Sequence, residues 1–319
     1  MAMSPDDALH DTALAASLEG NFSSRHAEVN GVRLHYVEGG AGEPLLLLGG
    51  WPQTWWQWNK VMPALARRHR VIAVDLRGMG GSGKPAGGYD KKTMAADVHA
   101  LVRHLGLSAV SIAGHDIGAM VAYAFAANHP EATTKIALLD VPHPDRTWSV
   151  FGLLPEPDQH LDSVIEAGAR SYLWWFAFNQ VRGLPERLLE GRSRLLVDWL
   201  FDRQAKDPAS IDERSRRVYA HAYSTADAVR AGNGWYQTFT RDIDDEQTYG
   251  RVSAPVLALG GDESNYVHLR ELMPSKGTDV QVAEVADCGH YIPEEQPQAV
   301  IDALTAFLGR PRHPLPVSP

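Results

Sequence analysis

Short apolar runs alternate with segments of helical periodicity along most of the chain. Continuous apolar runs of this length are typical of strands buried on both faces of a sheet. They lie at residues 44–48, 71–75, 109–113 and 135–139. Between two of them, residues 91–105 place Met94, Val98, Leu101 and Leu105 at helical spacing. The alternation predicts a mostly parallel sheet with helices on both faces.

The alternation is interrupted once. Between residues 143 and 246 the sequence is mostly helical in pattern and rich in aromatic residues, and strand patterns return after it. We therefore expect one α/β core carrying an inserted helical cap of a size typical of a small domain. The expected bounds are 25–142 and 247–309 for the core, 143–246 for the cap, and 1–24 and 310–319 for flexible tails.

Two shorter segments also give local predictions. Residues 26–29 and 32–38 flank Asn30-Gly31, a dipeptide that favours a two-residue hairpin turn. Residues 55–67 are predicted to form a helix, and the N-terminal tail has room for one short helix.

Composition narrows the possible functions. The chain has 319 residues and a net charge of −9 with His neutral, which argues against a nucleic-acid partner. Its one cysteine, Cys288, excludes an internal disulfide and argues against a cysteine-based metal site. No apolar run has the length of a membrane span, and the N-terminus has no basic segment typical of a secretory signal. These features predict a cytoplasmic protein, monomeric or homodimeric, whose partner is a small molecule.

The most distinctive chemistry lies at residues 109–119, where an apolar strand enters a helix through Gly-His-Asp-Ile-Gly. Gly114 and Gly118 leave room for a tight turn that no side chain could share. Asp116, at the apex, is expected at the carboxyl end of the sheet and at a helix N-terminus, which favours an ionised carboxylate. Asp is also a common helix cap. The two glycines and the buried strand favour a nucleophile over a cap.

This pattern resembles the α/β-hydrolase superfamily, in particular the branch of epoxide hydrolases and of haloacid and haloalkane dehalogenases, where aspartate replaces serine. The resemblance covers the chain from about residue 26 to residue 308. It implies an α/β-hydrolase fold in which Asp116 attacks a saturated carbon and forms an alkyl ester. Water then hydrolyses that ester with the help of a general base, an orienting acid and an oxyanion hole.

The resemblance assigns the general base to His290, in a Gly-His pair between the last strand and the last helix. The orienting acid has two candidates, because the family places it after the sixth or the seventh strand. Asp140 directly follows the sixth strand and is preferred. The usual position after the seventh falls at Ser264, which cannot ionise, so Asp262 is the alternative.

The Gly-Gly-Trp-Pro segment at residues 49–52 resembles the loop that completes the oxyanion hole. The backbone N–H groups of Trp51 and Ile117 are the expected donors. The family usually has histidine at the position of Gly49, where that side chain helps to hold the loop. This loop therefore lacks one of its usual supports.

Opening an epoxide also requires a proton donor on the side opposite the nucleophile, and the family supplies it from the cap. Residues 233–237 resemble the motif that carries this donor, which assigns the role to Tyr236. A second donor falls at Trp174, whose indole N–H can donate a hydrogen bond but is not an acid, and Tyr172 is its alternative. An apolar substrate pocket is expected, with walls that include Trp51, Pro52, Ile117, Trp174 and Trp175.

The residues that follow the nucleophile bear on the substrate. Fluoroacetate-type dehalogenases carry arginines one and four positions later, where this chain has Ile117 and Met120. We therefore predict hydrolysis of a neutral, hydrophobic epoxide to a vicinal diol, without a metal or an organic cofactor. A dehalogenase with the same nucleophile is the alternative, and a non-catalytic ligand-binding protein on this fold is the second alternative.

Overall fold

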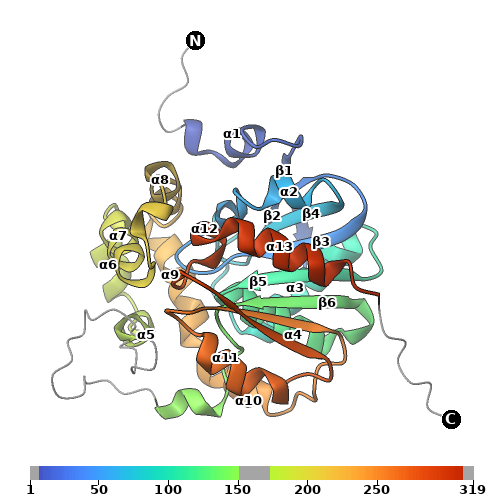
Figure 1. The fold of residues 1–319 in the computed structure, drawn as a ribbon. Helices are drawn as coiled ribbons and strands as arrows, with labels where there is room; N and C mark the ends of the chain where they lie inside the picture. The colour runs from blue at the N-terminus through green and yellow to red at the C-terminus, as the bar shows by residue number, and fades with distance from the viewer. Residues whose placement is uncertain (1–6, 151–172, 312–319) are drawn as a thin grey trace.

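The computed structural model describes residues 7–150 and 173–311. Within these residues the chain forms one eight-stranded sheet with the order β1-β2-β4-β3-β5-β6-β7-β8 (Figure 1). The strands are β1 (Ser23–Val29), β2 (Val32–Gly39), β3 (Glu43–Leu48), β4 (His69–Asp75), β5 (Val110–His115), β6 (Thr133–Leu139), β7 (Val256–Gly261) and β8 (Val280–Val285). Strand β2 is antiparallel to β1 and β4, and the pairs from β4 to β8 are parallel. The predicted mostly parallel sheet is confirmed.

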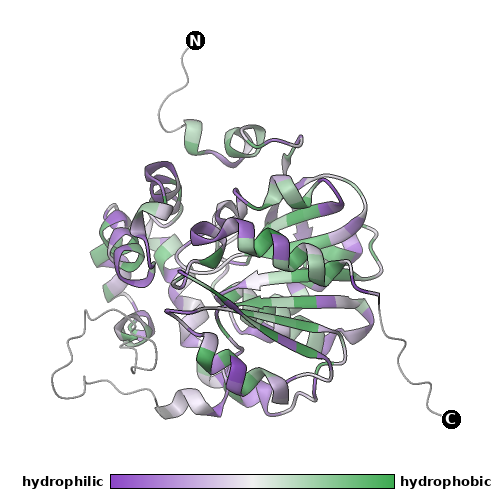
Figure 2. Ribbon diagram, in the orientation of Figure 1, coloured by the Kyte–Doolittle hydropathy of each residue, from purple (hydrophilic) through white to green (hydrophobic). Residues whose placement is uncertain are grey.

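The central strands are apolar on both faces because each face is covered by helices. Along β3, Leu46 and Leu48 pack into one hydrophobic cluster, and Leu45 and Leu47 pack into the other. All four side chains are fully buried. In Figure 2, green predominates along the middle of the central strands. The period of two along a strand thus divides one apolar run between two cores.

Helices of the core cover both faces of the sheet. Helices α3 (Lys91–His104) and α4 (Ile117–Asn128) pack against each other on one face, joined by α11 (Tyr266–Leu272). The opposite face is covered by α2 (Met62–Leu65) and α13 (Pro297–Leu308), with α12 (Ile292–Glu295) just before α13. Two short 3₁₀ helices, η3 (Pro130–Ala132) and η6 (Met273–Ser275), complete the connections.

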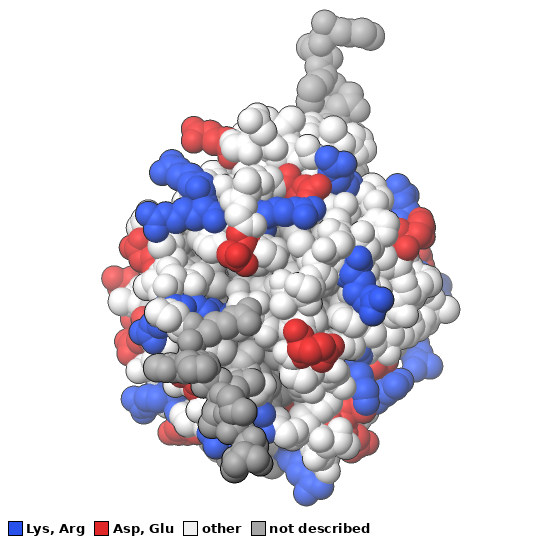
Figure 3. All heavy atoms as spheres, turned by 90° about the vertical axis from the view of Figure 1, so that its right-hand side faces the viewer, with Lys and Arg blue, Asp and Glu red and all other residues white. Residues whose placement is uncertain are grey.

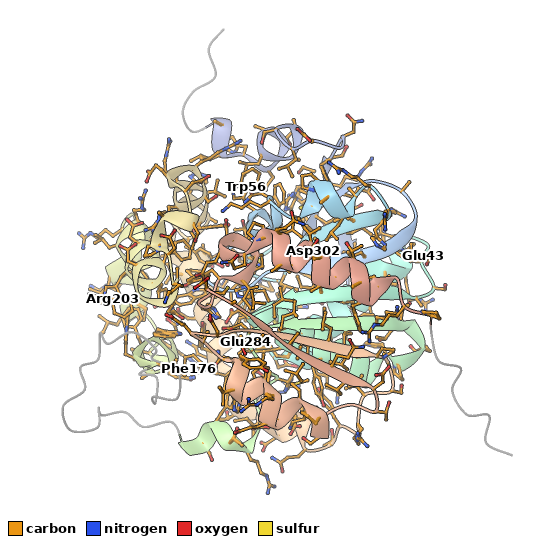
Figure 4. All side chains as sticks on the ribbon, in the orientation of Figure 1. Glu43, Trp56, Phe176, Arg203, Glu284 and Asp302 are labelled. Carbon is orange, nitrogen blue, oxygen red and sulfur yellow. The ribbon has the colours of Figure 1, made fainter. Side chains whose placement is uncertain are left out.

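The segment between β6 and β7 is helical wherever the structure describes it. Its elements are η4 (Arg146–Val150), α5 (Trp174–Gln180), α6 (Leu184–Leu189), α7 (Ser193–Gln204), η5 (Pro208–Ser210), α8 (Glu213–Ala222), α9 (Ala226–Gln237) and α10 (Phe239–Glu246). Helices α5 to α8 lie together beside the sheet, on the left in Figure 1. They lie far from Glu43 at the start of β3, on the side where Phe176 is labelled in Figure 4.

A buried ion pair ties this inserted segment to the core. The Lys91 ammonium, at the start of α3, lies 2.8 Å from Asp242 on α10 and donates to the Trp235 carbonyl at 2.7 Å. Lys91 and Asp242 are both fully buried. Because removing one partner leaves an uncompensated buried charge, such a change typically costs about 3–5 kcal/mol. The inserted helices are therefore firmly anchored to α3.

The N-terminal segment is packed over residues 7–22, in contrast to the flexible tail expected for residues 1–24. It forms η1 (Asp7–Leu9) and then α1 (Asp11–Ala16). Leu14 is fully buried, and the Asp11 carboxylate accepts a hydrogen bond from the Trp55 indole at 2.7 Å. The segment is ordered because it covers an apolar part of the core that a tail would leave exposed.

The helix predicted for residues 55–67 is divided into η2 (Trp55–Trp58) and the single turn of α2. Pro63 lies in the first turn of α2, where a missing backbone N–H leaves no hydrogen bond unmade. In a continuous helix the same proline would remove a bond and clash with the preceding turn. A single long helix is therefore excluded by Pro63.

Candidate active site

Asp116 lies at a strained turn between β5 and α4, with a positive φ of 53°. A Cβ on Gly114 would lie 2.2 Å from the Gly118 carbonyl oxygen, and one on Gly118 would lie 2.3 Å from that of Leu48. Only glycine fits at these two positions. The turn places the Asp116 side chain beyond the end of the sheet, and it retains 8% exposure. This is the geometry expected of a nucleophile elbow.

The Asp116 carboxylate is held by two backbone donors. The Trp51 N–H donates to Oδ1 at 2.8 Å, and the Ile117 N–H also donates to the carboxylate. Burial raises the pKa of Asp116, and the charge of His290 and these two N–H groups act in the opposite direction. The two donors can hold a carboxylate oxygen that becomes the oxyanion of a tetrahedral intermediate.

His290, in the loop after β8, connects two carboxylates. Its Nε2 lies 3.8 Å from Oδ2 of Asp116, and its Nδ1 lies 2.6 Å from Oδ2 of Asp140. Burial lowers the pKa of His290, but the hydrogen bond and charge of Asp140 together with the charge of Asp116 raise it overall. The Nε2 edge of the imidazole is thus directed at the Asp116 carboxylate.

Asp140 is buried and surrounded by donors. Besides His290, it accepts hydrogen bonds from the Ser264 hydroxyl at 2.8 Å and the Asn265 amide at 3.1 Å. Burial alone would raise the pKa of Asp140, but the hydrogen bond and charge of His290 and the Ser264 hydroxyl hold it below its usual value. Asp140 therefore remains an anion, able to orient His290.

Asp262, the alternative acid, has a different set of partners. Its carboxylate accepts from the backbone N–H of Asp287 at 3.1 Å and of Cys288 at 2.9 Å. It shapes the start of the loop that carries His290, without contacting the imidazole.

Two further side chains hold the His290 loop, and the sequence pattern did not single them out. Glu295 accepts from the N–H groups of Gly289 at 2.9 Å and Tyr291 at 2.8 Å. The His115 Nε2 atom lies 2.7 Å from the His290 carbonyl, and burial lowers the pKa of His115 to about 3. His115 is consequently neutral and donates to that carbonyl. Its position directly before Asp116 was the available signal.

The oxyanion loop has supports that replace the missing histidine at Gly49. The Gln57 side-chain oxygen accepts from the Gly50 N–H at 3.2 Å, and the Tyr223 hydroxyl donates to the Gln53 carbonyl at 3.0 Å. A Cβ on Gly50 would lie 2.5 Å from Oδ1 of Asp116. The loop thus passes directly over the carboxylate, and only glycine permits that approach.

Tyr236 on α9 faces the same region from the inserted helices. Its ring packs edge-on against Trp51 at 5.3 Å and against Phe176, labelled in Figure 4, at 5.3 Å. The Trp175 side chain lies near its hydroxyl. Burial, followed by the charge of Asp116, raises the pKa of Tyr236 well above its usual value. The Tyr236 phenol therefore keeps its proton unless a strong base accepts it.

The neighbouring tryptophan takes a different direction. Trp174 is only half-buried and packs against Trp199 at 5.1 Å and Phe178 at 5.7 Å. Trp175, not Trp174, is the indole that reaches the Tyr236 hydroxyl. Tyr172 lies outside the described residues.

Residues 43–297 match the family described as the alpha/beta hydrolase fold. This chain belongs to the α/β-hydrolase family. The α/β hydrolase is 35% identical over 294 residues to a soluble epoxide hydrolase of Corynebacterium, an alignment that covers 90% of this chain and 97% of the relative. It is 27% identical to a fluoroacetate dehalogenase of Burkholderia, over 91% of this chain and 95% of the relative. The solved structure of the epoxide hydrolase CorEH superposes with a TM-score of 0.78 at 33% identity, covering 90% of this chain and 99% of that one.

The remaining surface of this α/β hydrolase adds little to the site. On the face shown in Figure 3, basic and acidic side chains are interspersed.

Among residues 7–150 and 173–311, no helix has the length and apolar composition to cross a membrane. In the part of the chain that the structure describes, potential metal ligands cluster at two places, and neither cluster includes a residue that touches Asp116. These clusters are Asp11, His35 and Asp75, and His99, His129 and Glu131.

Proposed function

We propose that this α/β hydrolase converts an epoxide to a vicinal diol through an alkyl ester on Asp116. The observation that carries the proposal is that the two oxygens of the Asp116 carboxylate face different groups. Oδ1 accepts a hydrogen bond from the Trp51 N–H at 2.8 Å, and Oδ2 lies 3.8 Å from Nε2 of His290. The epoxide hydrolase names of the Corynebacterium relative and of CorEH support the same reaction.

In the first half-reaction, the Asp116 carboxylate attacks one ring carbon and the bond from that carbon to the epoxide oxygen breaks. The oxygen takes the proton of the Tyr236 hydroxyl and becomes the first alcohol. The Trp175 side chain, which lies near that hydroxyl and favours its ionised form, helps to stabilise the tyrosinate that is left. General acid catalysis of this kind typically contributes a factor of about 10²–10⁴.

In the second half-reaction, His290 removes a proton from water, and the hydroxide attacks the carbonyl carbon of the Asp116 ester. The developing oxyanion is held by the N–H groups of Trp51 and Ile117. Collapse of the tetrahedral intermediate expels the second oxygen of the diol, which takes the proton of the added hydroxyl group, and the Asp116 carboxylate is regenerated. Asp140 stabilises the His290 imidazolium until its proton returns to the Tyr236 oxygen, which restores the starting enzyme.

The inserted helical segment acts as a cap, residues 143–246, on a core formed by residues 25–142 and 247–309. In this division the core breaks the ester down and the cap supplies the proton, and core and cap together form the apolar walls around the substrate. Pro52, Trp51 and Trp175 belong to those walls.

A haloacid is a poor alternative substrate for this site. Its carboxylate would need a cation beside the nucleophile, but Ile117 and Met120 occupy the two positions after Asp116 where fluoroacetate-type enzymes carry arginine. Both side chains are buried in apolar surroundings. An uncharged epoxide fits these residues better.

The His290→Gln variant tests the proposal, because it removes the base of the second half-reaction and leaves the first intact. Incubation with an epoxide panel followed by intact-protein mass spectrometry is expected to show an adduct equal in mass to the epoxide, located on Asp116. The matched variant Asp116→Asn is expected to form none. If His290→Gln forms no adduct with any epoxide while the wild type releases halide from haloalkanes, the proposed reaction is wrong.

A further inference from the structure

A small cavity adjoins the Asp116 site on the side of the inserted helices. It is lined by Trp51 and Pro52 of the oxyanion loop, Leu196 and Val197 of α7, and Val229 and Asn233 of α9. Trp51 connects the cavity to the site, because its N–H donates to Asp116 and its ring packs against Tyr236. Trp51 is therefore shared by the wall of this cavity and by the Asp116 site.

Asn233 differs from the other polar groups of the cavity wall in one respect. The Ser193 hydroxyl donates to the Ala220 carbonyl at 2.6 Å, and the Tyr223 hydroxyl donates to the Gln53 carbonyl at 3.0 Å. The Asn233 amide nitrogen is buried and has no hydrogen-bond partner in the part of the chain that the structure describes. Since buried donors are almost always paired, a free amide in a ligand cavity points to a partner brought by the ligand.

The position of Asn233 along α9 relates it to the reacting centre. It precedes Tyr236 by three residues, so the two side chains share one face of the helix. The residue before Asn233, Gly232, lies very close to Trp51: a Cβ on Gly232 would lie 3.1 Å from the Trp51 indole nitrogen. This approach keeps α9 against the oxyanion loop, which fixes the distance between the Asn233 amide and the reacting carbon.

We propose that Asn233 is a specificity-determining residue that donates a hydrogen bond to an oxygen in the substrate's side chain. The preferred substrate is then an epoxide whose apolar arm carries an ether, carbonyl or hydroxyl oxygen. The inference rests on the proposed function and narrows its substrate class. A pocket built to hydrogen-bond one group discriminates against the analogue that lacks it, because the buried donor is left unpaired.

The experiment compares 1,2-epoxyoctane with analogues in which one chain methylene at a time is replaced by an ether oxygen. For the wild type, kcat/KM is expected to be about fivefold to tenfold higher for one of these ethers than for epoxyoctane, the size of a single hydrogen bond. Asn233→Leu is expected to abolish or reverse that ratio, and so is Asn233→Asp, which keeps the shape but removes the donor. Taking the ratio within each variant cancels differences in the amount of folded enzyme.

Ser193→Ala is the matched control, because that hydroxyl lines the same cavity but already donates to Ala220. It is expected to keep the ether preference. A ratio that stays unchanged in both Asn233 variants, or a wild type without any ether preference, would overturn this inference and leave the proposed function standing. A wild type that hydrolyses no epoxide at all would overturn both.

Discussion

The Nδ1 atom of His290 lies 2.6 Å from Asp140 although 150 positions separate the two residues. Asp140 follows β6 and His290 follows β8, so the contact spans the end of β7, which lies between them. It is possible because β7 ends in glycine: a Cβ on Gly261 would lie 2.3 Å from the Gly289 carbonyl oxygen. Because β7 ends in a residue without a side chain, the segments that follow β6 and β8 can be joined by one hydrogen bond.

This contact predicts different effects of removing the two acidic candidates. Asp140→Asn is expected to lower kcat for epoxide hydrolysis by at least about 100-fold, because His290 loses the anion that orients it. Asp262→Asn is expected to remain within a few-fold of the wild type, since the Asp262 carboxylate accepts hydrogen bonds from backbone N–H groups rather than from His290. Steady-state kinetics on one epoxide measures both, and the reverse order of effects would assign the orienting role to Asp262.

The same pair predicts the pH dependence of the second half-reaction. His290 acts as a base only when neutral, and its raised pKa places the loss of activity on the acid side. Because Asp140 raises that pKa, the residual activity of Asp140→Asn is expected to persist to lower pH than that of the wild type. A pH profile of single-turnover ester hydrolysis would show the acid limb displaced downwards; an unmoved limb would contradict the assignment.

Tyr236→Phe is expected to slow formation of the ester and to spare its hydrolysis. The phenyl ring keeps the packing against Trp51 and Phe176 but has no proton for the alkoxide. We expect kcat/KM for epoxides to fall by about 100-fold. Rapid-quench mass spectrometry should find no accumulated ester in Tyr236→Phe, in contrast to His290→Gln. Accumulation of the ester in both variants would show that Tyr236 does not act in ester formation.

Gly50→Ala is expected to reduce epoxide hydrolysis by about 100-fold or more, because the new methyl group would lie 2.3 Å from the Asp116 Cβ and displace the oxyanion loop. Gly87→Ala is the matched control, since nothing lies within 4 Å of its Cβ position. Circular dichroism should show both variants folded. Wild-type rates in Gly50→Ala would mean that the loop does not hold the oxyanion.

Glu294 on α12 predicts a pH dependence of stability. It is buried beside Lys60, 3.3 Å away, and the Tyr219 hydroxyl, and burial raises its pKa from 4.5 to about 7. The folded state therefore binds a proton that the unfolded state releases, so stability falls as pH rises from 4.5 to about 7. Integrated over that window the loss is about 3 kcal/mol.

Glu294→Gln cannot titrate and is the neutral analogue of the protonated side chain. Its free energy of unfolding, measured with urea at pH 5 and pH 8, is expected to gain on the wild type as pH increases. A constant difference between the two proteins would show that Glu294 is already ionised in the fold.

The sequence was sufficient for the elements with a strong local signal. The buried strands, the elbow at Asp116 and the Gly-His pair at His290 each occupy one short stretch of chain. Asp140 and Asp262 could not be separated in this way, because what distinguishes them is contact across β7. Gln57 and Glu295 escaped notice for the same reason, since each supports a loop only through the folded backbone.

The choice between Trp174 and Trp175 illustrates a finer limit. Adjacent residues on a helix point about 100° apart, so an error of one residue in register exchanges a wall of the pocket for a surface contact. Trp175 lies near the Tyr236 hydroxyl, and Trp174 packs against Trp199.

The helix predicted for residues 55–67 shows the opposite case, because a local signal was present. Pro63 indicates that this helix cannot be continuous, and in the structure its effect is stronger than that of the surrounding apolar pattern.

Tyr236 and Trp175 come from one contiguous stretch between β6 and β7, whereas Asp116, Asp140 and His290 come from loops of the sheet. In the proposed mechanism, activation of the leaving group and breakdown of the intermediate are thus encoded in separable parts of the gene. Exchange of that single stretch would give the scaffold a new electrophile without rebuilding its hydrolytic apparatus, so lineages with this architecture can diversify by replacing one module.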